Sequence, residues 1–162
     1  MKKTLFRSTF AAAILLAGLL AGCDGDIIVD PDDEGPVPFE TVYRSLNSGV
    51  SNSRGQVIRS FAEWDRVWDE IGDSGPAPAV NFGRDMVVLV AAGTQPNGCY
   101  SIDIRFIEVD RGFLEVEADL NVPAADCLCS PVVVRPVHAV RTPRIFNPSD
   151  FNIDRVIRSC GP

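Results

Sequence analysis

Acidic residues alternate along one predicted strand and form the first group that could do chemistry. Glu115, Glu117 and Asp119 lie two residues apart, so their side chains share one strand face. Paired carboxylates can act as general acid and base, and Asp103 could join them in a weak calcium site, although no Asp/Gly calcium loop is present. The simpler interpretation, which we favour, is the solvated face of a strand, because apolar residues alternate with them.

The histidine content and the nucleophile motifs offer no further candidate for catalysis. His138, the only histidine, lies in an apolar segment. Nucleophile signatures such as G-x-S-x-G do not occur in the chain. The sequence therefore predicts a protein without catalytic residues, bound metal or cofactor, which is not an enzyme.

Four cysteines fit either a zinc site or two disulfides: Cys99, Cys127, Cys129 and Cys160. Zinc is the poorer fit, because C-x-x-C spacing is absent and only one histidine is available. An even number of cysteines in an exported chain indicates disulfides. A bond between Cys127 and Cys129 would close a small, strained ring. We therefore expect these two to pair separately with Cys99 and Cys160, in either arrangement.

The fifth cysteine, Cys23, follows what looks like a bacterial export signal. After a basic start, an apolar stretch runs from Phe10 to Leu20, and the lipobox-like Leu20-Ala21-Gly22-Cys23 follows. At about 11 residues this stretch has the length of a signal-peptide core and is too short to span a bilayer. We expect residues 1–22 to be removed and Cys23 to be lipidated, which anchors the protein in a membrane of the cell envelope. An ordinary cleaved signal with a chance cysteine is the alternative.

The mature chain is strongly acidic. Removing residues 1–22 leaves 12 basic residues against 22 acidic ones, a net charge of −10. Phosphate binding needs a basic surface, so we expect no nucleic-acid partner. From Arg135 onward, however, five arginines stand against two aspartates. They either pair with acidic strands of their own domain, which we favour, or form a basic face for an acidic partner or anionic lipid headgroups.

The mature chain divides into a tether and one domain. Residues 23–38 are rich in Asp, Pro and Gly, a composition that keeps a segment extended. Residues 39–162 have the length of a single globular domain. No low-complexity tract interrupts this domain.

One amphipathic helix is well signalled. Ser60 and Glu63 form a capping box, and Gly72 ends the helix. The expected apolar face comprises Phe61, Trp64, Trp68 and Ile71. The two tryptophans could instead form an aromatic ligand platform, but their helical spacing favours core packing.

The other apolar patterns predict β-strands. Met86–Ala91 is a continuous apolar run, typical of a strand covered on both faces. Residues 101–106 and 114–121 alternate apolar and polar side chains. Val132–Val134 begins a further strand, which Pro136 restricts to an edge or a bulge. One helix among sequential strands indicates an α+β fold, mainly antiparallel β-sheet with the helix packed on it and disulfides linking the chain.

Residues 110–112 (Asp-Arg-Gly) predict a three-residue hairpin loop between the two alternating strands. In that register Phe106 faces Val116 on the inner side, and Arg105 faces Glu117 on the outer side. A two-residue loop would set Phe106 against Glu117 and mix the two faces. We therefore favour the three-residue loop.

A loop of glycine, proline and polar residues separates the buried strand from the first alternating one. Such a composition is typical of a shaped turn facing solvent. It is either a structural turn held by Cys99 or a binding loop. We hypothesise that it contacts a protein partner through Gly93, Thr94, Gln95, Pro96, Asn97, Gly98 and Tyr100.

Together these motifs resemble the PrcB C-terminal domain family, named for a subunit of a bacterial surface protease complex. The family shows an E-W-x-x-x-W helix, an apolar strand, a G-T-x-P-x-G-G-Y turn, a hairpin and a cysteine segment flanked by prolines. The corresponding features here are Glu63-Trp64 with Trp68, residues 81–90, the loop at 93–101 and the segment 123–131. The resemblance covers roughly residues 55–140.

The sequence departs from the family at two places. Cys99 replaces the second glycine of the turn, and the C-terminal extension through Cys160 is unusual. The resemblance implies a non-catalytic protein that stabilises or assembles with an exported protease. The loop also looks like the Pro/Gly loops of chagasin-type cysteine protease inhibitors, so direct inhibition of an exported protease is the alternative.

Overall fold

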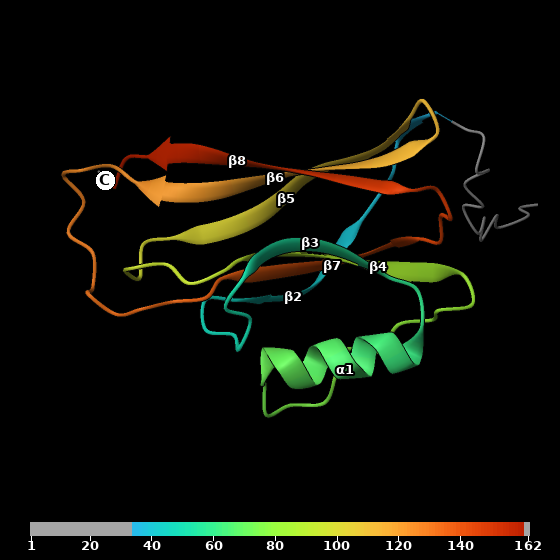
Figure 1. Ribbon diagram of the computed structural model, residues 1–162, viewed down its shortest axis with the longest axis horizontal. Coiled ribbons are helices and arrows are strands. Elements are labelled where there is room, and N and C mark those ends of the chain that lie inside the picture. Colours follow the sequence, from blue (N-terminus) through green and yellow to red (C-terminus); the bar gives the residue numbers. More distant parts are fainter. Residues whose placement is uncertain (1–33, 161–162) are drawn as a thin grey trace, which may run out of the picture.

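The computed structural model describes residues 34–160 and arranges them as two facing β-sheets with one helix outside them (Figure 1). The predicted signal peptide and Cys23 lie outside the described residues. The first sheet has the order β1-β5-β6-β8, with β1 Gly35–Pro36, β5 Ser101–Asp110, β6 Phe113–Pro123 and β8 Ser149–Arg158. The second has the order β2-β7-β4-β3, with β2 Glu40–Ser45, β7 Val137–Pro143, β4 Asp85–Ala92 and β3 Ser53–Ile58. Helix α1 spans Phe61–Ile71.

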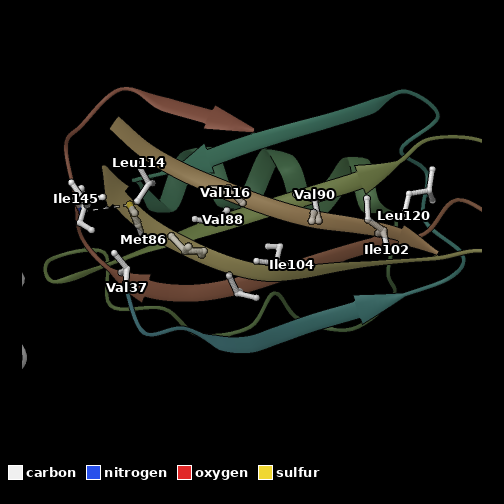
Figure 2. Packing of buried hydrophobic residues seen from close by; sticks show 14 of the residues in the cluster. Val37, Met86, Val88, Val90, Ile102, Ile104, Leu114, Val116, Leu120 and Ile145 are labelled. Atoms are coloured by element: carbon white, nitrogen blue, oxygen red, sulfur yellow. Dashed lines mark hydrogen bonds between the residues drawn. The ribbon is translucent and has the colours of Figure 1, made fainter. Parts of the chain in front are cut away.

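Strand β4 is buried on both faces, as its continuous apolar sequence predicted. Met86, Val88 and Val90 point between the two sheets and join the core drawn in Figure 2. The intervening residues of β4 contribute to a second core, between the second sheet and α1. The molecule therefore has three layers, with β4 in the middle one.

Helix α1 begins and ends where its capping residues predicted. The Ser60 hydroxyl accepts a hydrogen bond from the Glu63 amide at 3.3 Å, and Gly72 ends the helix in the left-handed conformation (φ 74°). Trp64 and Trp68 are core residues, and their indole nitrogens donate to backbone carbonyls of the following loop. The placement of Phe61 on the buried face is wrong, because this first helical residue is exposed.

The α+β prediction is confirmed, with one helix on a mainly antiparallel β structure. The strands form two sheets, however, and β6 pairs with β8 in parallel. A parallel pair needs a crossover connection. Here the chain between β6 and β8 passes through β7 of the other sheet, so the crossover joins the two sheets.

The β5–β6 hairpin contains both of the registers weighed above. Near the start of β5 the pairs Ile102–Leu120 and Ile104–Ala118 follow the register of the three-residue loop. A β-bulge then shifts the pairing, so the prediction that Phe106 faces Val116 is wrong and Phe106 faces Glu117. The turn consists of two residues, Arg111 and Gly112, both with positive φ.

The bulge reconciles the two-residue turn with a buried inner face. It inserts one extra residue into β5 near Arg105, so the side chains beyond it change sides. Ile107 takes the inner position and is fully buried, whereas Phe106 is 36% exposed. The alternation of β5 therefore has a phase change that simple periodicity did not reveal.

The boundaries of two predicted segments differ in the structure. Val132–Val134 does not begin a strand: β7 starts after Pro136, at Val137, and lies inside its sheet. Proline lacks the N–H needed inside a sheet, so it stands ahead of this strand. The packed chain also starts before Phe39, since β1 pairs with β5 and Val37 is buried. Within residues 34–160, no helix is long and apolar enough to cross a membrane.

Candidate functional site

The loop at residues 93–100 lies at one end of the molecule, together with the segment 124–136 (Figure 1). We call this the disulfide end. The opposite end contains the β5–β6 turn, residues 34–40 and residues 144–148, and we call it the hairpin end. The two ends are separated by the length of the strands, about 33 Å for ten residues.

Backbone contacts fix the loop where it leaves β4. Gly93 has φ 69°, and a side chain there would meet the Ser53 amide nitrogen at 2.7 Å. The Thr94 amide donates to the Ser51 carbonyl at 3.0 Å, and Gln95 forms an antiparallel bridge with Val134. The loop thus has a defined shape set by its neighbours.

Two disulfides reinforce this end of the molecule. Cys99 pairs with Cys129, and Cys127 pairs with Cys160, with Cα–Cα distances of 5.6 and 5.3 Å. Cys127 and Cys129 therefore reach out separately, as predicted, and the structure selects one of the two arrangements. The sulfur atoms of Cys99, Cys129 and Cys160 lie within 4.8 Å of one another. These atoms are held in the two bridges, so they are not thiolate ligands as arranged here.

The predicted contact residues of the loop differ in their exposure. Thr94 and Pro96 are exposed, whereas Gly93 is buried and the others are half-buried. The Gln95 side chain donates to the Ala92 carbonyl at 2.8 Å, and the Asn97 side chain accepts from the Cys99 amide at 3.1 Å. Gln95 and Asn97 therefore brace the loop, and Thr94 and Pro96 are its outward residues.

Sequence reasoning missed a group of aliphatic side chains beside this loop. Leu128 is fully exposed, and more than half the surface of Val132 and of Val133 is accessible. A Cβ atom on Gly98 would lie 3.5 Å from Val132, so this segment adjoins the loop. The signal in the sequence is the apolar Leu128 between two cysteines and the apolar run before Pro136, a run that also fits a strand.

The carboxylate row lies on the outer face of the first sheet and is paired with arginines. Arg105 contacts Glu117 at 2.6 Å, as predicted, although the bulge makes Phe106 the register partner of Glu117; Arg105 also reaches Asp119 at 3.4 Å. Arg158 also contacts Asp119, at 3.1 Å. Arg44 contacts Asp103 at 2.7 Å. Asp103 and Asp119 face each other across β5 and β6. Each has an arginine partner, and this positive charge offsets the repulsion between the two carboxylates.

The C-terminal arginines are used largely inside the domain. Besides Arg158, Arg141 contacts Glu40 at 2.5 Å. Arg144 donates to the Phe82 carbonyl, and its guanidinium group lies 5.0 Å from the centre of the Phe146 ring. The ion pairs of Arg141 and Arg158 agree with the favoured interpretation, in which the arginines pair with acidic strands of their own domain, whereas Arg144 contacts a carbonyl and an aromatic ring.

His138 links the two sheets. The Ile104 amide of β5 donates to its Nδ1 atom at 2.9 Å, and its Nε2 atom lies 2.9 Å from the Thr41 hydroxyl oxygen. Because an amide can only donate, Nδ1 is the unprotonated nitrogen of a neutral ring. Burial, followed by the nearby charge of Arg44, lowers the His138 pKa to about 4, while Asp103 acts in the opposite direction. The side chain is 1% exposed, which makes it a structural link.

The His138 pKa predicts that the protein loses stability in mild acid. Unfolded histidine binds a proton below about pH 6.5, whereas folded His138 resists protonation until about pH 4, so stability falls as pH falls through this window. We expect a loss of about 2 kcal/mol between about pH 7 and about pH 5, measured by urea unfolding. His138→Asn, whose side-chain oxygen can accept the Ile104 bond, should lack most of this loss. An equal loss in both proteins would contradict the buried neutral histidine.

The disulfide arrangement gives a second prediction. Peptide mapping of the unreduced mature protein should recover Cys99 linked to Cys129 and Cys127 linked to Cys160. Replacing either pair with serine should lower the free energy of unfolding by roughly 2–4 kcal/mol, with similar losses because the sequence separations are 30 and 33. Recovery of a peptide linking Cys127 to Cys129 would refute this arrangement.

A comparison with known families identifies the segment that carries the loop. Residues 86–143 match the family model described as PrcB C-terminal. A search of curated proteins and a search of solved structures gave no match. The matched segment runs from β4 to the end of β7 and includes the loop, the β5–β6 hairpin and the cysteine segment; β3 and α1 precede it. The resemblance inferred from the motifs is thereby confirmed for residues 86–143, which are similar to the PrcB C-terminal family.

Proposed function

We propose that this protein is a lipid-anchored, non-catalytic interaction module that assembles with an exported protease and stabilises it. The observation that carries the proposal is the rigid loop at residues 93–100, which lies in the PrcB C-terminal segment beside exposed aliphatic side chains. The anchor is the lipidated Cys23 inferred from the lipobox. The partner surface is the disulfide end of the domain.

The composition of this surface supports a protein partner. Thr94 and Pro96 stand outward from the loop, and Leu128, Val132 and Val133 are exposed next to it. Exposed aliphatic side chains gathered in one place are typical of protein contact sites.

The rigidity of the loop supports the same role. Binding requires a flexible loop to lose conformational freedom, which weakens the complex. Here the Cys99–Cys129 bond, the bridge between Gln95 and Val134, and the side-chain hydrogen bonds fix the loop beforehand. Less ordering is then needed when the partner binds.

The anchor can be tested by changing one residue. Cys23→Ser removes the thiol that would be acylated, so the variant should remain unprocessed or become soluble after cleavage. Membrane flotation and mass spectrometry of the N-terminus measure both outcomes. A variant that is cleaved after residue 22 and still partitions into membranes would refute the lipid anchor.

The partner surface can be tested with one variant at an outward residue of the loop and one in the aliphatic segment beside it. Pro96→Arg and Val132→Arg place a charge on the proposed contact surface and should lower partner affinity by about tenfold or more, with little change in melting temperature. Binding is measured by affinity capture from native membranes and quantification of the bound protease. Pro76→Arg, at an exposed proline after α1, is the matched control. If both variants capture the protease as well as the unsubstituted protein does, this surface is not the partner site and the loop is a structural turn only.

The two disulfides provide a further control for the same experiment. Replacing Cys99 and Cys129 with serine releases the loop, whereas replacing Cys127 and Cys160 removes a bond of similar span that does not hold it. The two double variants should lose similar stability, but only the replacement of Cys99 and Cys129 should weaken capture of the partner. Activity then separates the two modes of action: an assembly subunit raises the yield of active protease, and an inhibitor lowers its turnover when added in trans.

A further inference from the structure

Exposed phenylalanines gather at the hairpin end of the domain. Their accessible fractions are Phe39 36%, Phe61 68%, Phe113 48% and Phe146 68%. Phenylalanine contributes a large apolar surface without a polar group. Four such side chains exposed at one end are typical of a surface that contacts another molecule or a membrane.

Hydrogen bonds bring the four segments that carry these phenylalanines together. The Arg59 guanidinium, just before α1, donates to the carbonyls of Ile145 and Asn147, on either side of Phe146. The Asn147 amide group donates to the Gly112 carbonyl, next to Phe113. The Thr142 hydroxyl donates to the Pro38 carbonyl at 2.9 Å, which places Phe39 near the end of β7.

The tether joins the domain at this same end. Strand β1 begins at Gly35 and pairs with Val109, next to the β5–β6 turn (Figure 1). Glu34 follows Cys23 by 11 residues, which span at most about 40 Å when fully extended. A lipid on Cys23 would thus hold the hairpin end nearer to the membrane than the disulfide end.

We propose that the hairpin end lies against the lipid bilayer, with Phe113 and Phe146 inserted at the level of the headgroups. This inference rests on the proposed lipid anchor. Apolar side chains at such a surface bind by burial at the boundary between headgroups and acyl chains. The protein would then be oriented, with the 93–100 loop pointing away from the membrane and free to meet its partner.

The charges at this end indicate which kind of lipid contact is involved. Ion pairs join Arg141 to Glu40 at 2.5 Å and Arg111 to Asp110 at 2.7 Å. Glu40 and Asp110 offset these two arginines, and Arg59 and Arg144 at the same end donate to backbone carbonyls, so the end does not present a row of free guanidinium groups to anionic headgroups. Contact should therefore depend on apolar burial and occur on uncharged bilayers.

The test places a fluorescent residue at each end of the mature, lipidated chain. Phe146→Trp reports on the hairpin end, and Leu128→Trp, at a fully exposed residue of the disulfide end, is the matched control. Both proteins are reconstituted into phosphatidylcholine vesicles with and without brominated acyl chains, which quench tryptophan at close range. The signal of the unsubstituted chain, from buried Trp64 and Trp68, is subtracted.

We expect the added tryptophan of Phe146→Trp to emit at shorter wavelength in vesicles and to be quenched at least about twofold more than that of Leu128→Trp. Adding phosphatidylglycerol or salt should change this little. Equal quenching at both ends, or stronger quenching for Leu128→Trp, in a chain that floats with the vesicles would overturn the orientation and leave the anchor intact. Quenching that appears only with phosphatidylglycerol would overturn the apolar contact. A mature chain that fails to float would refute the lipid anchor, and the inference with it.

Discussion

The structure depends on the double burial of β4. Its residues from Met86 to Ala92 are apolar and buried, so each face of the strand must be covered by another layer. The first sheet covers one face, and α1 covers the other. A single sheet with a helix on one side would have left one row of these side chains in water. The three-layer arrangement follows from this constraint.

Packing the two sheets against each other buries polar groups, and these groups need hydrogen-bond partners inside the domain. The Ile104 amide lies where β5 leaves regular pairing before its bulge, and it would be unsatisfied without the imidazole of His138. The Arg44–Asp103 ion pair spans the same edge between the sheets, nearer to solvent. These contacts join the edge of the first sheet to β2 and β7 of the second. His138 thus joins the two sheets, and it can accept the Ile104 hydrogen bond only because its ring is neutral.

The two ends of the strands have different surfaces. At the disulfide end the connections are held by two covalent bonds and display a loop beside aliphatic side chains. At the hairpin end the connections display phenylalanines, next to the point where the tether enters. This separation would allow one small domain to face the membrane and a protein partner at the same time, since the sheets hold the two surfaces apart.

The sequence by itself determined the features that depend on neighbouring residues. The α1 helix follows from Ser60, Glu63 and Gly72, which satisfy backbone groups within one turn of each end. The buried strand β4 follows from a run that has no polar side chain to face water. The separation of Cys127 from Cys129 follows from the geometry of a disulfide ring. The PrcB C-terminal segment was likewise recognisable, because its turn and cysteine segment are local motifs.

Tertiary structure decided whatever depends on distant segments. The hairpin has a two-residue turn and a bulge at Arg105. The turn requires one strand register and the burial of the inner face requires another. The bulge allows both, and this becomes evident only when the two sheets are packed. The choice of Cys129 for Cys99 depends on the parallel pairing of β8 with β6, which brings Cys160 beside Cys127. Val132 became a surface residue because the Gln95–Val134 bridge, and not a strand, fixes that segment. Local periodicity carries no information about the disulfides or the Gln95–Val134 bridge, since each joins residues at least 30 positions apart. In the hairpin, two local preferences favour different registers, and periodicity does not choose between them.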